Sequence, residues 1–82
     1  GYQRLIFNLC TSAQDAMIHR DKLLALVGME KSDDPDYYRH QLSRLRSYVK
    51  RGIAEGYFVS LSELDGGTWT IKKQWVLPFV NN

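Results

Sequence analysis

The sequence predicts an α+β domain in which three helices precede a two-stranded β-hairpin. Apolar residues recur with the helical period of about 3.6 up to roughly residue 51, and with a period of two from about residue 57. The chain has 82 residues, 44% hydrophobic and 24% charged, which suits one folded domain and is too short for two. We therefore treat residues 1–82 as a single domain.

The first helix is expected over residues 2–11. One apolar face of this segment is formed by Leu5, Ile6, Leu9 and Cys10. Since Cys10 belongs to that face, we expect a buried thiol and no nucleophile.

A second helix is expected over residues 19–27. Residues 12–16 break the helical pattern and are expected to be a connection, while Met17 and Ile18 form a short apolar pair leading into the next element. Leu23, Leu24 and Val27 then share one face. Gly28 follows at the position where helices commonly end in the left-handed conformation.

The third helix has the strongest local signals. Asp34 can cap the first free N–H groups, Pro35 fits the first helical position, and Asp36 favours the positive end of the helix dipole. We expect this helix to run over residues 35–51 and to stop at Gly52.

The hairpin is expected over residues 57–64 and 68–77. Apolar residues alternate with polar ones in both segments, at Val59, Leu61, Trp69 and Ile71. Asp65-Gly66-Gly67 lies between them and tolerates positive φ, and Pro78 limits the second strand. Three helices followed by such a hairpin is the order of a winged helix-turn-helix: a three-helix core with a C-terminal β-hairpin wing.

Positive charge is concentrated in the third helix. The whole chain has a net charge of +2, yet residues 37–52 hold five cations and no anion: Arg39, Arg44, Arg46, Lys50 and Arg51. A solvated helix face normally mixes charges of both signs, so this stretch favours an anionic partner, most simply nucleic acid. The alternative interpretation is a solvated face without a partner.

On a helical wheel, the third helix divides into a core stripe and a polar face. The stripe contains Tyr38, Leu42, Leu45 and Val49. His40 either contacts DNA or pairs with Asp36, whereas Arg39 and Arg46 border the stripe and reach phosphates or acidic neighbours. Tyr37 and Tyr48 are expected to be packing residues. The candidate DNA-binding residues are His40, Ser43, Arg44, Arg46, Ser47, Lys50, Arg51 and Arg39.

Two segments at a characteristic separation resemble a known family. They read Ile18-His19-Arg20-Asp21-Lys22-Leu23-Leu24 and Tyr38-Arg39-His40-Gln41-Leu42-Ser43-Arg44-Leu45-Arg46. This pair is similar to the second and recognition helices of OmpR/PhoB-type winged-helix DNA-binding domains, the effector domains of response regulators. The resemblance covers roughly residues 2–51 and implies that Arg44 and Arg46 contact DNA. The family's N-terminal four-stranded sheet has no counterpart here, and its usual wing turn is replaced by Asp65-Gly66-Gly67.

Several function classes find no support in the sequence. One cysteine and two distant histidines exclude a disulfide framework and make a metal site unexpected. We recognise no catalytic constellation, and expect no enzyme activity, no cofactor and no small-molecule ligand. Neither a membrane span nor a secretory signal is recognisable, so a cytoplasmic location is expected, at the nucleoid if the source is bacterial.

The sequence therefore predicts a sequence-specific, double-stranded-DNA-binding domain of a transcription regulator, with the third helix in the major groove. The acidic wing tip at Asp65 argues against close approach of the wing to DNA. The alternative is a winged helix used for protein–protein contact through an aromatic and apolar tail, namely Trp69, Trp75, Phe79 and Val80. If these four residues make no such contact, we expect them to close the core over the first helix. The sequence does not decide whether the domain forms a homodimer.

Overall fold

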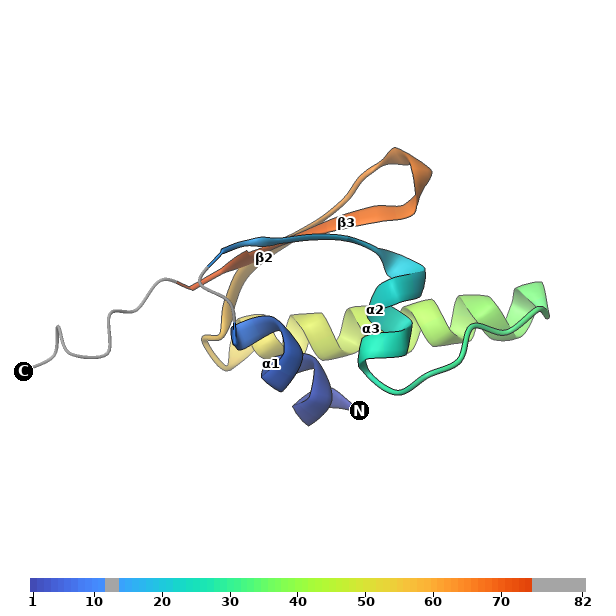
Figure 1. Ribbon diagram of the computed structural model, residues 1–82, viewed down its shortest axis with the longest axis horizontal. Helices are drawn as coiled ribbons and strands as arrows, with labels where there is room; N and C mark the ends of the chain where they lie inside the picture. Colours follow the sequence, from blue (N-terminus) through green and yellow to red (C-terminus); the bar gives the residue numbers. More distant parts are fainter. Residues whose placement is uncertain (12–13, 75–82) are drawn as a thin grey trace, which may run out of the picture.

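The computed structural model describes residues 1–11 and 14–74. The elements follow in the order α1 (Tyr2–Cys10), β1 (Ala16–His19), α2 (Arg20–Leu26), α3 (Pro35–Ala54), β2 (Phe58–Glu63) and β3 (Thr68–Lys73). A short 3₁₀ turn, η1 (Asp65–Gly67), connects β2 to β3. The helices lie on one side of the sheet, and the tip of the β2–β3 hairpin points away from α3 (Figure 1). The α+β class, the three helices and the C-terminal hairpin are confirmed.

The sheet has a third strand that the sequence analysis did not predict. All pairs are antiparallel in the order β1-β3-β2, with Ala16 opposite Ile71 and His19 opposite Thr68. The prediction that residue 16 belongs to a connection, and that Met17 only leads into a helix, was wrong. A four-residue strand is too short to establish a period, and its pairing partner lies about fifty residues further along the chain.

The hairpin turn has the predicted backbone. Gly66 and Gly67 both adopt positive φ, at 82° and 90°, which residues with a side chain rarely do. The Leu64 N–H donates to the Thr68 carbonyl and closes the turn at 2.8 Å. The second strand ends at Lys73. The predicted extension of this strand to residue 77 lies outside the described residues.

One apolar core joins the helices to the inner face of the sheet. Its two largest fully buried side chains are Trp69 of β3 and Phe58 of β2. The aliphatic part of the core comes from every helix: Leu5, Leu9, Leu23, Leu24, Leu42, Leu45 and Val49. The proposed role of Trp69 in the core is confirmed, while Trp75, Phe79 and Val80 lie outside the described residues.

The prediction that Cys10 is buried was wrong, because the thiol is exposed. The buried stripe of α1 consists of Tyr2, Leu5 and Leu9. Cys10 lies about 100° around the helix from Leu9, beyond the strip that the core covers.

The third helix begins as predicted and ends later. The Asp34 side chain accepts the Asp36 N–H at 3.0 Å, with Pro35 at the first helical position. The predicted end at Gly52 was wrong, since α3 continues to Ala54. Gly52 is buried under β2: a Cβ atom there would lie 2.5 Å from the Phe58 ring. This glycine permits close packing, and the left-handed residue that follows the helix is Gly56, at φ 89°.

Within the described residues, no helix is both long and apolar enough to cross a membrane.

Candidate nucleic-acid interface

The polar face of α3 is exposed along most of its length. Leu42, Leu45 and Val49 are buried as predicted. The side chains on the opposite face are all exposed: Tyr37, His40, Ser43, Arg44, Ser47, Lys50 and Arg51. The hydroxyl of Ser47 donates to the Ser43 carbonyl at 3.1 Å, so it is held against its own helix. The packing role expected for Tyr37 was wrong, since its side chain is 56% exposed, whereas Tyr48 packs against the core as expected.

Tyr38 is half-buried, and the prediction that it lies wholly in the core was only partly right. Its ring packs against the core, while its hydroxyl makes polar contacts with α2. Arg20 Nε donates to the Tyr38 hydroxyl at 2.9 Å, and that hydroxyl donates to Asp21 Oδ1. Burial, followed by the hydrogen bond to Asp21, raises the pKa of the Tyr38 phenol.

The five cations of α3 differ in their neighbours. Arg39 forms an exposed ion pair with Asp36 one turn earlier, and therefore replaces His40 as the partner suggested for that carboxylate. Arg44 forms no hydrogen bond or ion pair with any residue in the described ranges. With Lys50, which is also exposed and makes no such contact within the described residues, it is therefore one of the two cations of this face that are most available to a ligand.

Arg46 points toward the sheet and pairs with Glu63 at the end of β2. Its Nε lies 2.6 Å from Glu63 Oε2, and its Nη2 lies 2.8 Å from Oε1, so the contact is bidentate. The guanidinium also lies 5.4 Å from the Trp69 ring centre. These hydrogen bonds lower the pKa of the Glu63 carboxyl and raise that of Arg46. The expectation that Arg46 pairs with an acidic neighbour is confirmed.

Arg51 lies on the α1 side of the helix. Its guanidinium carbon is 4.1 Å from the Tyr2 ring centre, and its Nε donates to Glu55 at 3.2 Å. The Tyr2 hydroxyl donates to the same carboxylate at 2.6 Å. Burial and the hydrogen bond to Glu55 raise the pKa of Tyr2 to about 12. Arg51 is thus separated from the part of α3 that faces the hairpin.

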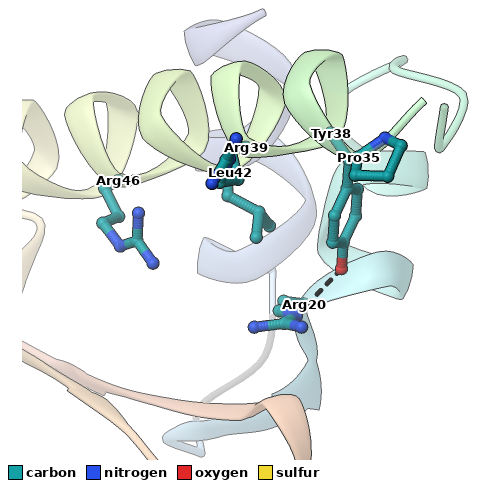
Figure 2. A pocket seen from close by; sticks show the side chains of 6 residues that line it. All are labelled: Arg20, Pro35, Tyr38, Arg39, Leu42 and Arg46. Carbon is teal, nitrogen blue, oxygen red and sulfur yellow. Dashed lines mark hydrogen bonds between the residues drawn. The ribbon is translucent and has the colours of Figure 1, made fainter.

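A cavity of about 490 Å³ lies between the N-terminal half of α3 and the start of α2. We call it the arginine groove; it is lined by Arg20, Pro35, Tyr38, Arg39, Leu42 and Arg46 (Figure 2). In Figure 2 the guanidinium groups of Arg20 and Arg46 both point into the space between helix and sheet. Sequence reasoning singled out Arg39 and Arg46 but missed Arg20, whose place becomes clear only when α2 packs against α3.

The hairpin turn lies directly beside this groove. A Cβ atom at Gly67 would lie 2.7 Å from His19 Nε2 and 3.3 Å from Arg20 Nε. The turn is therefore held against the start of α2, next to the groove's arginines. Asp65, at the beginning of the turn, is exposed.

The described residues show no group of three or more His, Cys, Asp or Glu side chains that could hold a metal ion. Comparisons of the chain with protein-family models, curated proteins and solved structures gave no match.

Proposed function

We propose that this chain is a winged helix-turn-helix domain that binds double-stranded DNA, with α3 in the major groove. The observation that carries the proposal is the exposed face of α3. From Arg39 to Arg51 this face offers cations and hydrogen-bonding groups with no carboxylate, while the opposite face is buried. A helix in the major groove needs this distribution, because phosphates surround it and base edges present donors and acceptors.

The arrangement of the elements supports the same proposal. A helix, a strand, two helices and a hairpin follow one another, and the sheet order β1-β3-β2 places the hairpin at one side of the helical layer. The hairpin serves as the wing, and β1 anchors it to the start of α2 through His19. Such a wing contacts the backbone or minor groove next to the helix.

Roles follow from position and exposure. Arg44, with His40 and Ser43 beside it, is the candidate for reading base edges, because an arginine can bind guanine O6 and N7 together. Lys50 and Arg39 are exposed at the sides of this face and suit phosphates. Arg51 lies about 10 Å further along the axis than Arg44 and packs on Tyr2, so we assign it no base contact.

The experiment is a titration of the chain into duplex DNA selected from a random-sequence pool, and into an unrelated duplex, each at two salt concentrations. A steep fall in affinity with salt indicates phosphate contacts. Arg44→Ala is expected to weaken binding to the selected duplex by about 1–3 kcal/mol and to relax its sequence preference.

Two variants make this test specific. Arg44→Lys keeps the charge and loses the fork-shaped donor geometry, so it should keep the affinity for unrelated DNA and lose sequence preference. Lys22→Ala removes a similarly exposed cation from α2 and serves as the control for net charge. If Arg44→Ala binds each duplex with the same affinity as the wild type, Arg44 does not contact the bases.

Self-association through a winged helix is the second candidate function. Phe7 of α1 is 70% exposed and Tyr57 is 45% exposed, and both line a cavity of about 380 Å³ at the α1 side. Sedimentation equilibrium over a range of protein concentrations tests this candidate. A mass that doubles with concentration in the wild type, but not in Phe7→Ser, would favour it.

A further inference from the structure

The carboxylate of Glu63 binds Arg46, one of the three arginines that line the arginine groove. It receives two parallel N–H···O bonds from Arg46, the same fork that arginine presents to a phosphate. Glu63 and Trp69 are cross-strand partners, and Trp69 packs beneath the guanidinium. The arginine is therefore held in a defined position by the hairpin.

Two further cations act on the same carboxylate. The low pKa of Glu63 arises first from the Arg46 hydrogen bonds and, more weakly, from the fields of Arg46, Arg20 and Lys50. Arg20 is fixed from the other side, because its Nε donates to the Tyr38 hydroxyl. Positive charge from α2 and from two turns of α3 thus converges on one internal anion.

The pair remains accessible to solvent. The side chain of Arg46 is 37% exposed and that of Glu63 is 36% exposed. An ion pair with this exposure is worth at most about 1 kcal/mol, since water and salt screen it. An anion that gains contacts with several of these cations can therefore displace the carboxylate.

We propose that the arginine groove is a seat for one phosphate of the DNA backbone, and that Glu63 is an internal competitor which holds Arg46 until that phosphate replaces it. This inference rests on the proposed function. The phosphodiester would bind between α3 and the hairpin, contacting Arg46 and Arg20, with Arg39 at the rim. Because Glu63 must give up its hydrogen bonds each time, it lowers the affinity for all DNA and leaves sequence discrimination to contacts made elsewhere on α3.

The test is the DNA affinity of Glu63→Gln. Glutamine keeps an oxygen that accepts a hydrogen bond from Arg46 and removes the charge. Affinity for both the selected and the unrelated duplex should rise by up to about fivefold, which matches an exposed ion pair. The slope of log affinity against log salt should also steepen, by up to about 0.9.

Glu55→Gln is the matched control. It neutralises the carboxylate of another arginine pair on the same helix, at the α1 side and away from the groove. Glu55→Gln changes the net charge by the same amount as Glu63→Gln. Because Glu55 lies away from the groove, the DNA affinity of Glu55→Gln should change much less. A gain equal to that of Glu63→Gln would mean that net charge alone is responsible, and would overturn the proposal.

A double-mutant cycle tests the local mechanism. In an Arg46→Gln background, Glu63→Gln should bring little further gain, because the arginine that it releases is missing. If Glu63→Gln still raises the DNA affinity in the Arg46→Gln background, the groove proposal is overturned and the proposed function stands. The same holds if the wild type binds DNA and Glu63→Gln binds it with unchanged affinity. A wild type that binds neither duplex would overturn both this inference and the proposed function. Melting temperatures of every variant confirm that the folded state is compared.

Discussion

Arg39, Arg46 and Arg51 all have carboxylate partners, and the partners differ in their distance along the chain. Asp36 and Glu55 lie three and four residues away on or beside the same helix, whereas Glu63 lies 17 residues away on β2. Exposed pairs one turn apart contribute little to stability. Three of the five cations are therefore partly neutralised in the folded chain, which leaves Arg44 and Lys50 as the most open ones.

The Arg46–Glu63 pair predicts how stability depends on pH. Since folding lowers the pKa of the Glu63 carboxyl below its ordinary value, the pair stabilises the folded state fully above the unfolded pKa of about 4.5. That contribution disappears as the pH falls through the lowered folded-state pKa. Because the carboxyl is partly exposed, the contribution is below about 1 kcal/mol.

Urea denaturation of the wild type and Glu63→Gln, at neutral pH and near pH 3, measures this contribution. The wild type should be the more stable at neutral pH, and the difference should narrow in acid. Other carboxylates titrate in both proteins and cancel in the comparison. A difference that is constant with pH would show that glutamine disturbs packing and that the charge has no part in it.

At the scale of the element, the end of α3 is decided by contact with β2. The chain turns at Gly56, where φ is 89°, and Phe58 then returns over the last helical turn to lie on Gly52. The connection from α3 to β2 is short, so this contact determines where the hairpin begins relative to the helix.

Gly52→Ala should therefore destabilise the domain. Alanine in a helix interior ordinarily stabilises relative to glycine by about 0.5–1 kcal/mol. Here the added Cβ would meet the Phe58 ring at 2.5 Å, and overpacking of this kind costs about 1–3 kcal/mol. Thermal and urea denaturation measure the net effect.

The Phe58→Leu background separates the stabilisation by alanine in a helix from the cost of overpacking against Phe58. A smaller side chain at position 58 relieves the close contact, so Gly52→Ala should cost less there than in the wild type. An increase in stability on adding Gly52→Ala to the wild type would mean that β2 does not pack on this turn.

Considering the whole molecule, α2 and the N-terminal half of α3 line the arginine groove, and the hairpin turn lies beside it next to Arg20. The turn is fixed against α2 at Gly67, and β1 ties the start of α2 to the sheet. A DNA backbone that follows α3 would pass close to the turn, where Asp65 carries a negative charge.

Asp65→Asn should strengthen DNA binding, because it removes repulsion between this carboxylate and phosphates. A charge about 8 Å from a phosphate in water changes affinity roughly twofold, and salt screens the effect. Stability should hardly change, because asparagine suits the same turn. The measurement is affinity at low and moderate salt, with melting temperature as the control. Equal affinities at low salt would place the turn away from the DNA.

The features that depend on neighbouring residues could be predicted from the amino-acid order. Asp34 and Pro35 set the start of α3, the glycines of the turn set the hairpin, and the apolar stripe of Leu42 and Leu45 set which face of α3 is buried. The amino-acid order also placed Arg44 on the exposed face. Capping, glycine backbone freedom and helical period act over a few residues, so they can be recognised without a fold.

The features that depend on distant contacts became visible in the folded structure. β1 forms by pairing with β3, and the Phe58 ring packs against Gly52 inside α3. Arg46 turns toward the sheet because Glu63 lies opposite. Arg20 belongs to the candidate site for the same reason, because its Nε donates to the Tyr38 hydroxyl of α3. These contacts join residues that are about 6 to 55 positions apart and arise only when the helices and the sheet pack around a shared core, which no local pattern in the sequence records.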